Sequence, residues 1–199
     1  VAAAPVAVET SLESSQVQAG APVDVNCQGF DTYGNVIEEQ PEETALAIDH
    51  LFEVHQGLQE EFVVRGTIVG SYSVACTIGP EVVDETPETL IIVPGVAADS
   101  TTTVTPATLY PTETATVVCS YTDLYGNLLT DVPSTISILP ESSDPEVMNG
   151  ITLEADQVSA IKQGRYFVFC YYIILRWQCW PAFSLCIWRL CLRLGCELA

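Results

Sequence analysis

The chain has 199 residues, with 26 Asp and Glu against 6 Lys and Arg, so its formal net charge is −20. This balance excludes a nucleic-acid binder, because a phosphate backbone is held mainly by clustered Lys and Arg. Residues 1–160 hold 25 acids and a single base, Arg65, whereas residues 161–199 hold five bases and a single acid, Glu197. Two compositions are therefore joined in one chain, whose length allows one large domain or two of about 100 residues.

Short strands are predicted along the first 93 residues. Apolar and β-branched residues alternate with polar ones over four to eight positions, and Gly, Pro, Asn or Asp separate the segments. The segments are VDVNC (23–27), TALAI (44–48), EFVVRGTIV (61–69), SYSVACTI (71–78) and TLIIV (89–93). Since no stretch of the first 160 residues shows a sustained helical period, the sequence predicts an all-β fold.

A turn motif, Asp-x-Tyr-Gly-Asn, lies between two of the predicted strands, at Asp31, Tyr33, Gly34 and Asn35. Gly and Asn tolerate positive φ, and an Asp side chain can accept backbone N–H bonds across a turn. The motif predicts a hairpin turn, and we expect its Tyr to pack beside that turn.

The strand and the turn recur 92 residues later. VDVNCQGFDTYGNVIEEQP (23–41) matches ATVVCSYTDLYGNLLTDVP (115–133), which repeats the motif at Asp123, Tyr125, Gly126 and Asn127. A second block, GSYSVAC (70–76), returns at an offset of 94 as GRYFVFC (164–170). Self-similarity at nearly one period predicts tandem repeats, which we place at 1–94 and 95–170 with a tail at 171–199.

Two cysteine pairs fall at matching places in the repeats. Cys27 and Cys76 are 49 residues apart, Cys119 and Cys170 are 51 apart, and each lies on an apolar strand. The sheets of a sandwich lie about 10 Å apart, and a disulfide between them is the immunoglobulin arrangement. We predict two structural disulfides and an oxidising compartment; the alternative is two pairs of buried free thiols in a reducing cytosol.

These motifs resemble, in order and spacing, the bacterial immunoglobulin-like domains of the invasin and intimin type. Such domains show an Asp-x-x-Gly-Asn hairpin and, later, a Gly-x-Tyr-x-Val strand, and the resemblance covers about residues 1–170. It implies tandem sandwiches that form a stalk or adhesive array on a cell surface, without catalytic residues. The chain departs from the pattern by placing Cys where these domains usually carry an apolar residue.

Residues 171–199 break the repeat. After Cys76 the first repeat continues with an acidic loop and a strand, whereas Cys170 is followed by YYIILRWQCWPAFSLCIWRLCLRLGCELA. A membrane anchor needs about 20 mostly apolar residues, and Arg176 and Pro181 interrupt this run. A metal site at Cys179, Cys186, Cys191 and Cys196 lacks any CxxC pair or nearby His. We favour a third interpretation, a shifted reading frame or an unspliced or chimeric segment that removes the last strand of the second repeat.

The sequence argues against the other candidate sites. His50 and His55 flank Glu53, but positions five apart on a strand face opposite sides, so we expect solvated histidines. Two acidic clusters are interpreted as solvated loop charges, since neither has the spacing of an EF-hand. Their members are Glu38, Glu39, Glu42 and Glu43, and Asp84, Glu85 and Glu88. A calcium site near Asp99, at the junction of the repeats, stays open as an alternative.

The sequence therefore predicts two tandem immunoglobulin-like β-sandwiches, the second with an altered or missing last strand. The expected function is a non-enzymatic extracellular module, a spacer or adhesive stalk repeat of a larger cell-surface or secreted protein. We expect no catalytic residue, cofactor or metal. The partners would be neighbouring repeats and a cell-surface protein or polysaccharide, with membrane contact by the tail less favoured. The alternative is an accessory carbohydrate- or protein-binding domain of a secreted enzyme, which exposed aromatics at Tyr110, Tyr121 and Phe30 would support.

Overall fold

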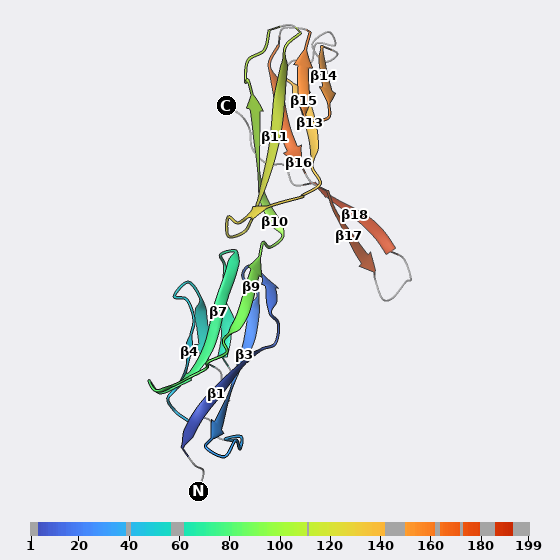
Figure 1. Ribbon diagram of the computed structural model, residues 1–199. Coiled ribbons are helices and arrows are strands. Elements are labelled where there is room, and N and C mark those ends of the chain that lie inside the picture. The colour runs from blue at the N-terminus through green and yellow to red at the C-terminus, as the bar shows by residue number, and fades with distance from the viewer. Residues whose placement is uncertain are drawn as a thin grey trace. The chain divides into compact units, whose positions relative to one another are not determined.

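A computed structural model describes residues 4–38, 41–56, 62–110, 112–141, 150–161, 164–171, 173–179 and 186–192. These residues form strands joined by turns and irregular connections, and none of them belongs to a helix that could span a membrane. The chain divides into two compact units, residues 1–96 with 125–127, and residues 97–124 with 128–199. Each unit is described by itself below (Figure 1).

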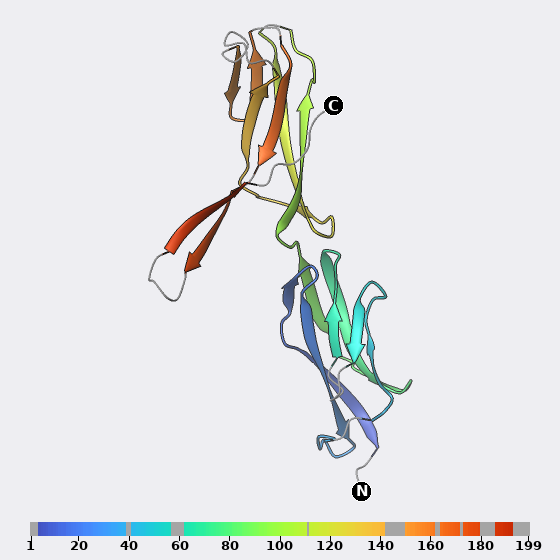
Figure 2. The ribbon, with the colours of Figure 1, turned by 180° about the vertical axis from the view of Figure 1, so that it is seen from behind.

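The first unit is a sandwich of two sheets, which Figures 1 and 2 show from opposite sides. Its strands are β1 (Pro5–Leu12), β2 (Gln16–Gln18), β3 (Pro22–Asp31), β4 (Thr44–Ala47), β5 (Glu53–Gln56), β6 (Phe62–Arg65), β7 (Gly70–Ile78), β8 (Val82–Val83) and β9 (Glu88–Val93). One sheet has the order β1-β3-β6-β5, and the other has the order β2-β9-β7-β4 with β8 added to β7. All of these pairs are antiparallel except β2 with β9, which is parallel.

Alternation of buried and exposed residues along strands such as β3 and β9 builds much of the core of this unit. In β3, Val23, Val25 and Cys27 are buried, and the residues between them are exposed. In β9, Leu90 and Ile92 are fully buried, Thr89 and Ile91 are exposed, and Val93 is half-buried. Because successive side chains of a strand point to opposite faces, the period-two pattern in the sequence places one face of each sheet against the other.

The second unit repeats much of this plan. Its strands are β10 (Ala97–Thr105), β11 (Thr114–Asp123), β12 (Leu128–Leu129), β13 (Thr135–Pro140), β14 (Ile151–Glu154), β15 (Gln157–Ala160), β16 (Tyr166–Tyr171), β17 (Ile173–Cys179) and β18 (Cys186–Leu192). One sheet has the order β10-β11-β15-β14 with β12 paired to β11, and a second sheet consists of β13 and β16. The registers match across the repeats, since Thr10 lies opposite Cys27 in β1 and β3, and Thr102 lies opposite Cys119 in β10 and β11.

The two units differ at the last strand. In the first, β9 pairs with β7 and contributes two core residues. In the second, β16 pairs with β13, and the described residues provide no other strand beside it. The tail strands β17 and β18 pair with each other in a separate two-stranded sheet. The described part of the second sandwich therefore has no counterpart of β9, and the truncation of the second repeat stays a prediction.

Candidate functional site

Each sandwich has a disulfide between its two sheets. Cys27 on β3 bonds to Cys76 on β7, with 5.6 Å between the Cα atoms, and both residues are buried. Cys119 on β11 bonds to Cys170 on β16, with 5.7 Å between the Cα atoms. Both predicted pairings are confirmed, and the alternative of free thiols is wrong. Such cross-links form and persist in oxidising compartments, in agreement with the predicted extracellular or cell-surface localisation.

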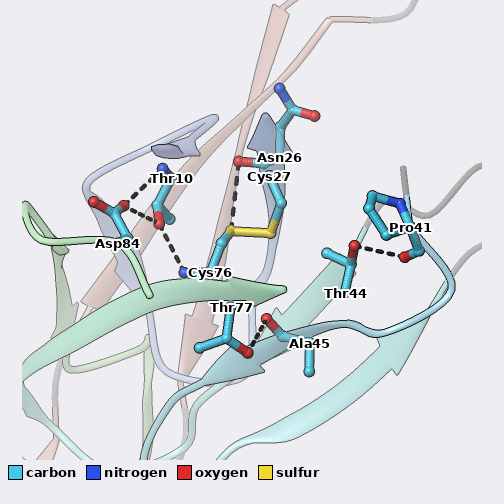
Figure 3. Close-up of a disulfide and its surroundings, with 9 residues drawn as sticks. All are labelled: Thr10, Asn26, Cys27, Pro41, Thr44, Ala45, Cys76, Thr77 and Asp84. Atoms are coloured by element: carbon cyan, nitrogen blue, oxygen red, sulfur yellow. Dashed lines mark hydrogen bonds between the residues drawn. A yellow bond between two sulfur atoms is a disulfide. The ribbon is translucent and has the colours of Figure 1, made fainter. Parts of the chain in front are cut away.

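A threonine beside the first disulfide links the two sheets a second time (Figure 3). The backbone N–H of Cys76, in one sheet, donates to Oγ1 of Thr10 on β1, in the other sheet, at 2.8 Å. The hydroxyl of Thr10 donates in turn to a carboxylate oxygen of Asp84, which also accepts the Thr10 backbone N–H at 2.8 Å. A buried N–H needs an acceptor, and here a side chain supplies one.

Both oxygens of the Asp84 carboxylate accept hydrogen bonds. Its second oxygen accepts the backbone N–H of Thr86 at 2.8 Å and the Thr86 hydroxyl at 3.1 Å. Burial acts to raise the pKa of Asp84, but the hydrogen bonds from Thr10 and Thr86 outweigh it and hold the pKa below its ordinary value. The expectation of a solvated charge is wrong for Asp84, which is 5% exposed, because four donors replace its water.

The second unit retains half of this arrangement. The backbone N–H of Cys170 donates to Oγ1 of Thr102 at 3.0 Å, and Thr102 is buried at 8% exposure. Thr102 lies 92 positions after Thr10, the offset of the turn motif, so the repeat relates the two threonines in the sequence although neither belongs to that motif. The residue 94 positions after Asp84 is Gln178, so the repeat does not carry the carboxylate forward.

The first Asp-x-Tyr-Gly-Asn turn is held by the side chain of Asp31. One of its oxygens accepts the backbone N–H groups of Tyr33 and Asn35, both at 2.9 Å, and the other accepts the Asn35 amide at 3.0 Å. The Asn35 amide, together with these N–H groups, holds the pKa of Asp31 below its ordinary value. Gly34 has φ of 77°, in the left-handed region that Gly enters without steric cost.

The Tyr of this turn does not pack beside it. Tyr33 is 84% exposed, and its described contact with the turn is the hydrogen bond from its backbone N–H to Asp31. In the second turn Gly126 has φ of 83° and Tyr125 is 46% exposed, whereas Asp123 is buried at 2%. The hairpin-turn role proposed for the eight motif residues stays a prediction. The expectation that Tyr33 packs beside its turn is wrong.

The remaining candidates lie apart from these features. Of the three aromatics that would support a binding domain, Tyr110 is 74% exposed, Tyr121 is buried in the second core, and Phe30 is half-buried. His50 is exposed, and its Nδ1 lies 3.0 Å from Oδ1 of Asp49. His55 is an exposed residue of β5.

The described residues hold no group of three or more His, Cys, Asp or Glu placed to bind a metal ion. Two residues weighed earlier, Glu39 and Cys196, lie outside the described residues.

Two sheets packed face to face and joined by a buried disulfide define an immunoglobulin-like β-sandwich.

No protein-family model matches the chain, and no curated protein matches it. The solved structures include two similar adhesion proteins. The FdeC adhesin of Escherichia coli is 15% identical, with a TM-score of 0.50 and coverage of 85% of this chain and 60% of that one.

Invasin, a bacterial integrin-binding protein, is 16% identical, with a TM-score of 0.46 and coverage of 83% of this chain and 36% of that one. The chain therefore spans 60% of the FdeC structure and 36% of the invasin structure. At this identity the likeness to FdeC concerns the fold alone. At that level it confirms the bacterial immunoglobulin-like sandwich that the motifs resembled.

Proposed function

We propose that the chain is a non-enzymatic extracellular module, a spacer or adhesive stalk repeat of a larger cell-surface or secreted protein. The observation that carries this proposal is the path of the chain through the first sandwich. Strand β2 is parallel to β9, and Figure 1 shows the chain entering this unit at the start of β1 and leaving at the opposite end, after β9. A unit with its ends at opposite poles extends the protein when it is repeated.

The contacts of the terminal strands fit a unit that bears tension. Gln16, Val17 and Gln18 of β2 pair with Ile91, Ile92 and Val93 of β9. Because the two strands are parallel, a pull on both chain ends slides one along the other and loads their hydrogen bonds together. The disulfide adds a limit, since the residues between Cys27 and Cys76 cannot be drawn out while it is closed.

The domain boundaries proposed for this module are residues 1–94 and 95–170, followed by the tail 171–199. The division into two compact units near residue 96 supports the first boundary. Neighbouring repeats of the same chain are the partners that this organisation favours, and a cell-surface protein or polysaccharide is the proposed ligand of an adhesive form.

Force spectroscopy of single molecules tests the spacer function. We expect unfolding of the first unit to release a longer segment after reduction, by about 170 Å for the 49-residue separation at full extension. A Cys27→Ala, Cys76→Ala variant is the control, and it should show the long step for this unit without reductant. Release of the same length with and without reductant, or unfolding of both units at negligible force, would contradict the proposal.

A further inference from the structure

The strand β16 has one paired edge in the described part of the chain. Its counterpart β7 lies between β4, which pairs with residues 75–78, and β9, which pairs with residues 70–74. Strand β16 pairs with β13, and no strand of the described residues takes the place of β9. An edge of this kind is a template on which an extended peptide can add as a new strand.

The core beside that edge lacks two aliphatic side chains that the first unit has. Leu90 and Ile92 of β9 are at most 1% exposed and belong to the first core. The residues 94 positions later are Ser184 and Cys186. The first unit thus shows which side chains this fold accepts at the missing strand, namely large aliphatic residues at alternate positions.

A buried hydroxyl gives an independent sign of a missing partner. Thr10 both accepts the N–H of Cys76 and donates its proton to Asp84. Thr102 accepts the N–H of Cys170, but within the described part of the chain its hydroxyl proton has no acceptor. Since Thr102 is more than nine-tenths buried, a donor without an acceptor is costly there.

We propose that the second sandwich binds an extended peptide segment of another polypeptide, with the chemistry of residues 84–92. Such a segment carries an Asp and, six and eight residues later, two large aliphatic residues. Its strand adds antiparallel to β16, in the register of β9 on β7, so that the counterpart of Glu88 lies opposite Val168 and that of Ile92 opposite Gly164. Its Asp accepts the hydroxyl proton of Thr102.

A labelled peptide of residues 82–94, VVDETPETLIIVP, tests this proposal on the oxidised full chain. We expect saturable binding and slower amide exchange at residues 164–170. A peptide with Leu90→Asp and Ile92→Asp should not bind, because it cannot fill the core. A peptide with Asp84→Asn should bind about tenfold more weakly, since it loses a hydrogen bond to a charged acceptor.

The Thr102→Val chain tests the contact between the Thr102 hydroxyl and the Asp of the peptide separately from the aliphatic contacts with the core. It should distinguish the parent peptide from the Asp84→Asn peptide less than the unchanged chain does, because it has no hydroxyl to donate to the Asp, although its backbone N–H at position 102 is retained. The peptide comparison stands even if this variant folds poorly. Equal binding of the parent and Leu90→Asp, Ile92→Asp peptides, no binding of the parent peptide, or protection at residues 70–74 instead of 164–170 would overturn the proposal.

Discussion

The backbone N–H of Cys170 donates to Oγ1 of Thr102 at 3.0 Å, as the N–H of Cys76 does to Thr10 at 2.8 Å. In both units the cysteine and the threonine belong to different sheets. Each disulfide is therefore accompanied by a hydrogen bond that crosses the sandwich in the same region. The bond satisfies a buried donor that would otherwise oppose the close approach of the sheets.

Replacing Thr10 by Val should destabilise the first unit. The change keeps the side-chain shape but leaves the Cys76 N–H and one Asp84 oxygen without this partner, and the expected loss is about 2 kcal/mol. Urea denaturation followed by amide exchange in β7 measures it. Ser11→Ala, at the exposed neighbouring position of the same strand, is the matched control and should change little. Equal effects of the two variants would show that the Thr10 contacts contribute nothing.

The stability of the first unit should depend on pH through Asp84. Its pKa in the folded chain lies below the ordinary value, so its contribution is complete above the unfolded pKa of about 4. That contribution falls as the pH drops through the folded pKa. The stability difference between the unchanged chain and Asp84→Asn should therefore be largest near neutral pH and shrink in acid. A difference independent of pH would contradict this account.

Removing the first disulfide should weaken the unit more than either substitution. Closing a loop of 49 residues contributes about 4 kcal/mol through the unfolded chain. The Cys27→Ala, Cys76→Ala double variant should lose an amount of that order in the same denaturation experiment. The Cys119–Cys170 bridge remains in this variant, so amide exchange in β11 serves as the internal control and should be unaffected.

Asp31 and Tyr33 of the first turn should differ in their response to substitution. Asp31→Ala removes the acceptor of three hydrogen bonds and should lower the urea midpoint of the first unit. Tyr33→Ser changes a side chain that is 84% exposed and should leave the midpoint where it was. A larger effect from Tyr33→Ser would restore the packing role first expected for this Tyr.

The coding DNA tests the origin of the tail. If a frame shift replaced the last strand, another frame after codon 170 should encode an acidic loop and a strand like ETLIIV. The equivalent positions are 178, 184 and 186, where an acid and two aliphatic residues are expected. If neither of the other frames continues in this way, the shifted-frame interpretation fails.

The repeat offset, the alternating strands and the cysteine spacing were sufficient to predict the sandwich and both disulfides, because each is a local or periodic signal. The contacts of Asp84 were not predictable in this way. Its partner Thr10 is 74 residues away, and the Asp84 carboxylate lies in a segment that is as acidic as a solvated loop. Tyr33 shows the complementary limit, since an aromatic residue at a turn carries no sign of the direction in which it points.

The cross-links also bear on how such a chain crosses a membrane. Once Cys27 is joined to Cys76, the 49-residue separation becomes a closed ring, and a ring cannot pass a narrow pore as a single extended strand. Export must therefore precede oxidation, or the route must be wide enough for folded sandwiches. Only in the first case are the cysteines reduced while the chain crosses the membrane.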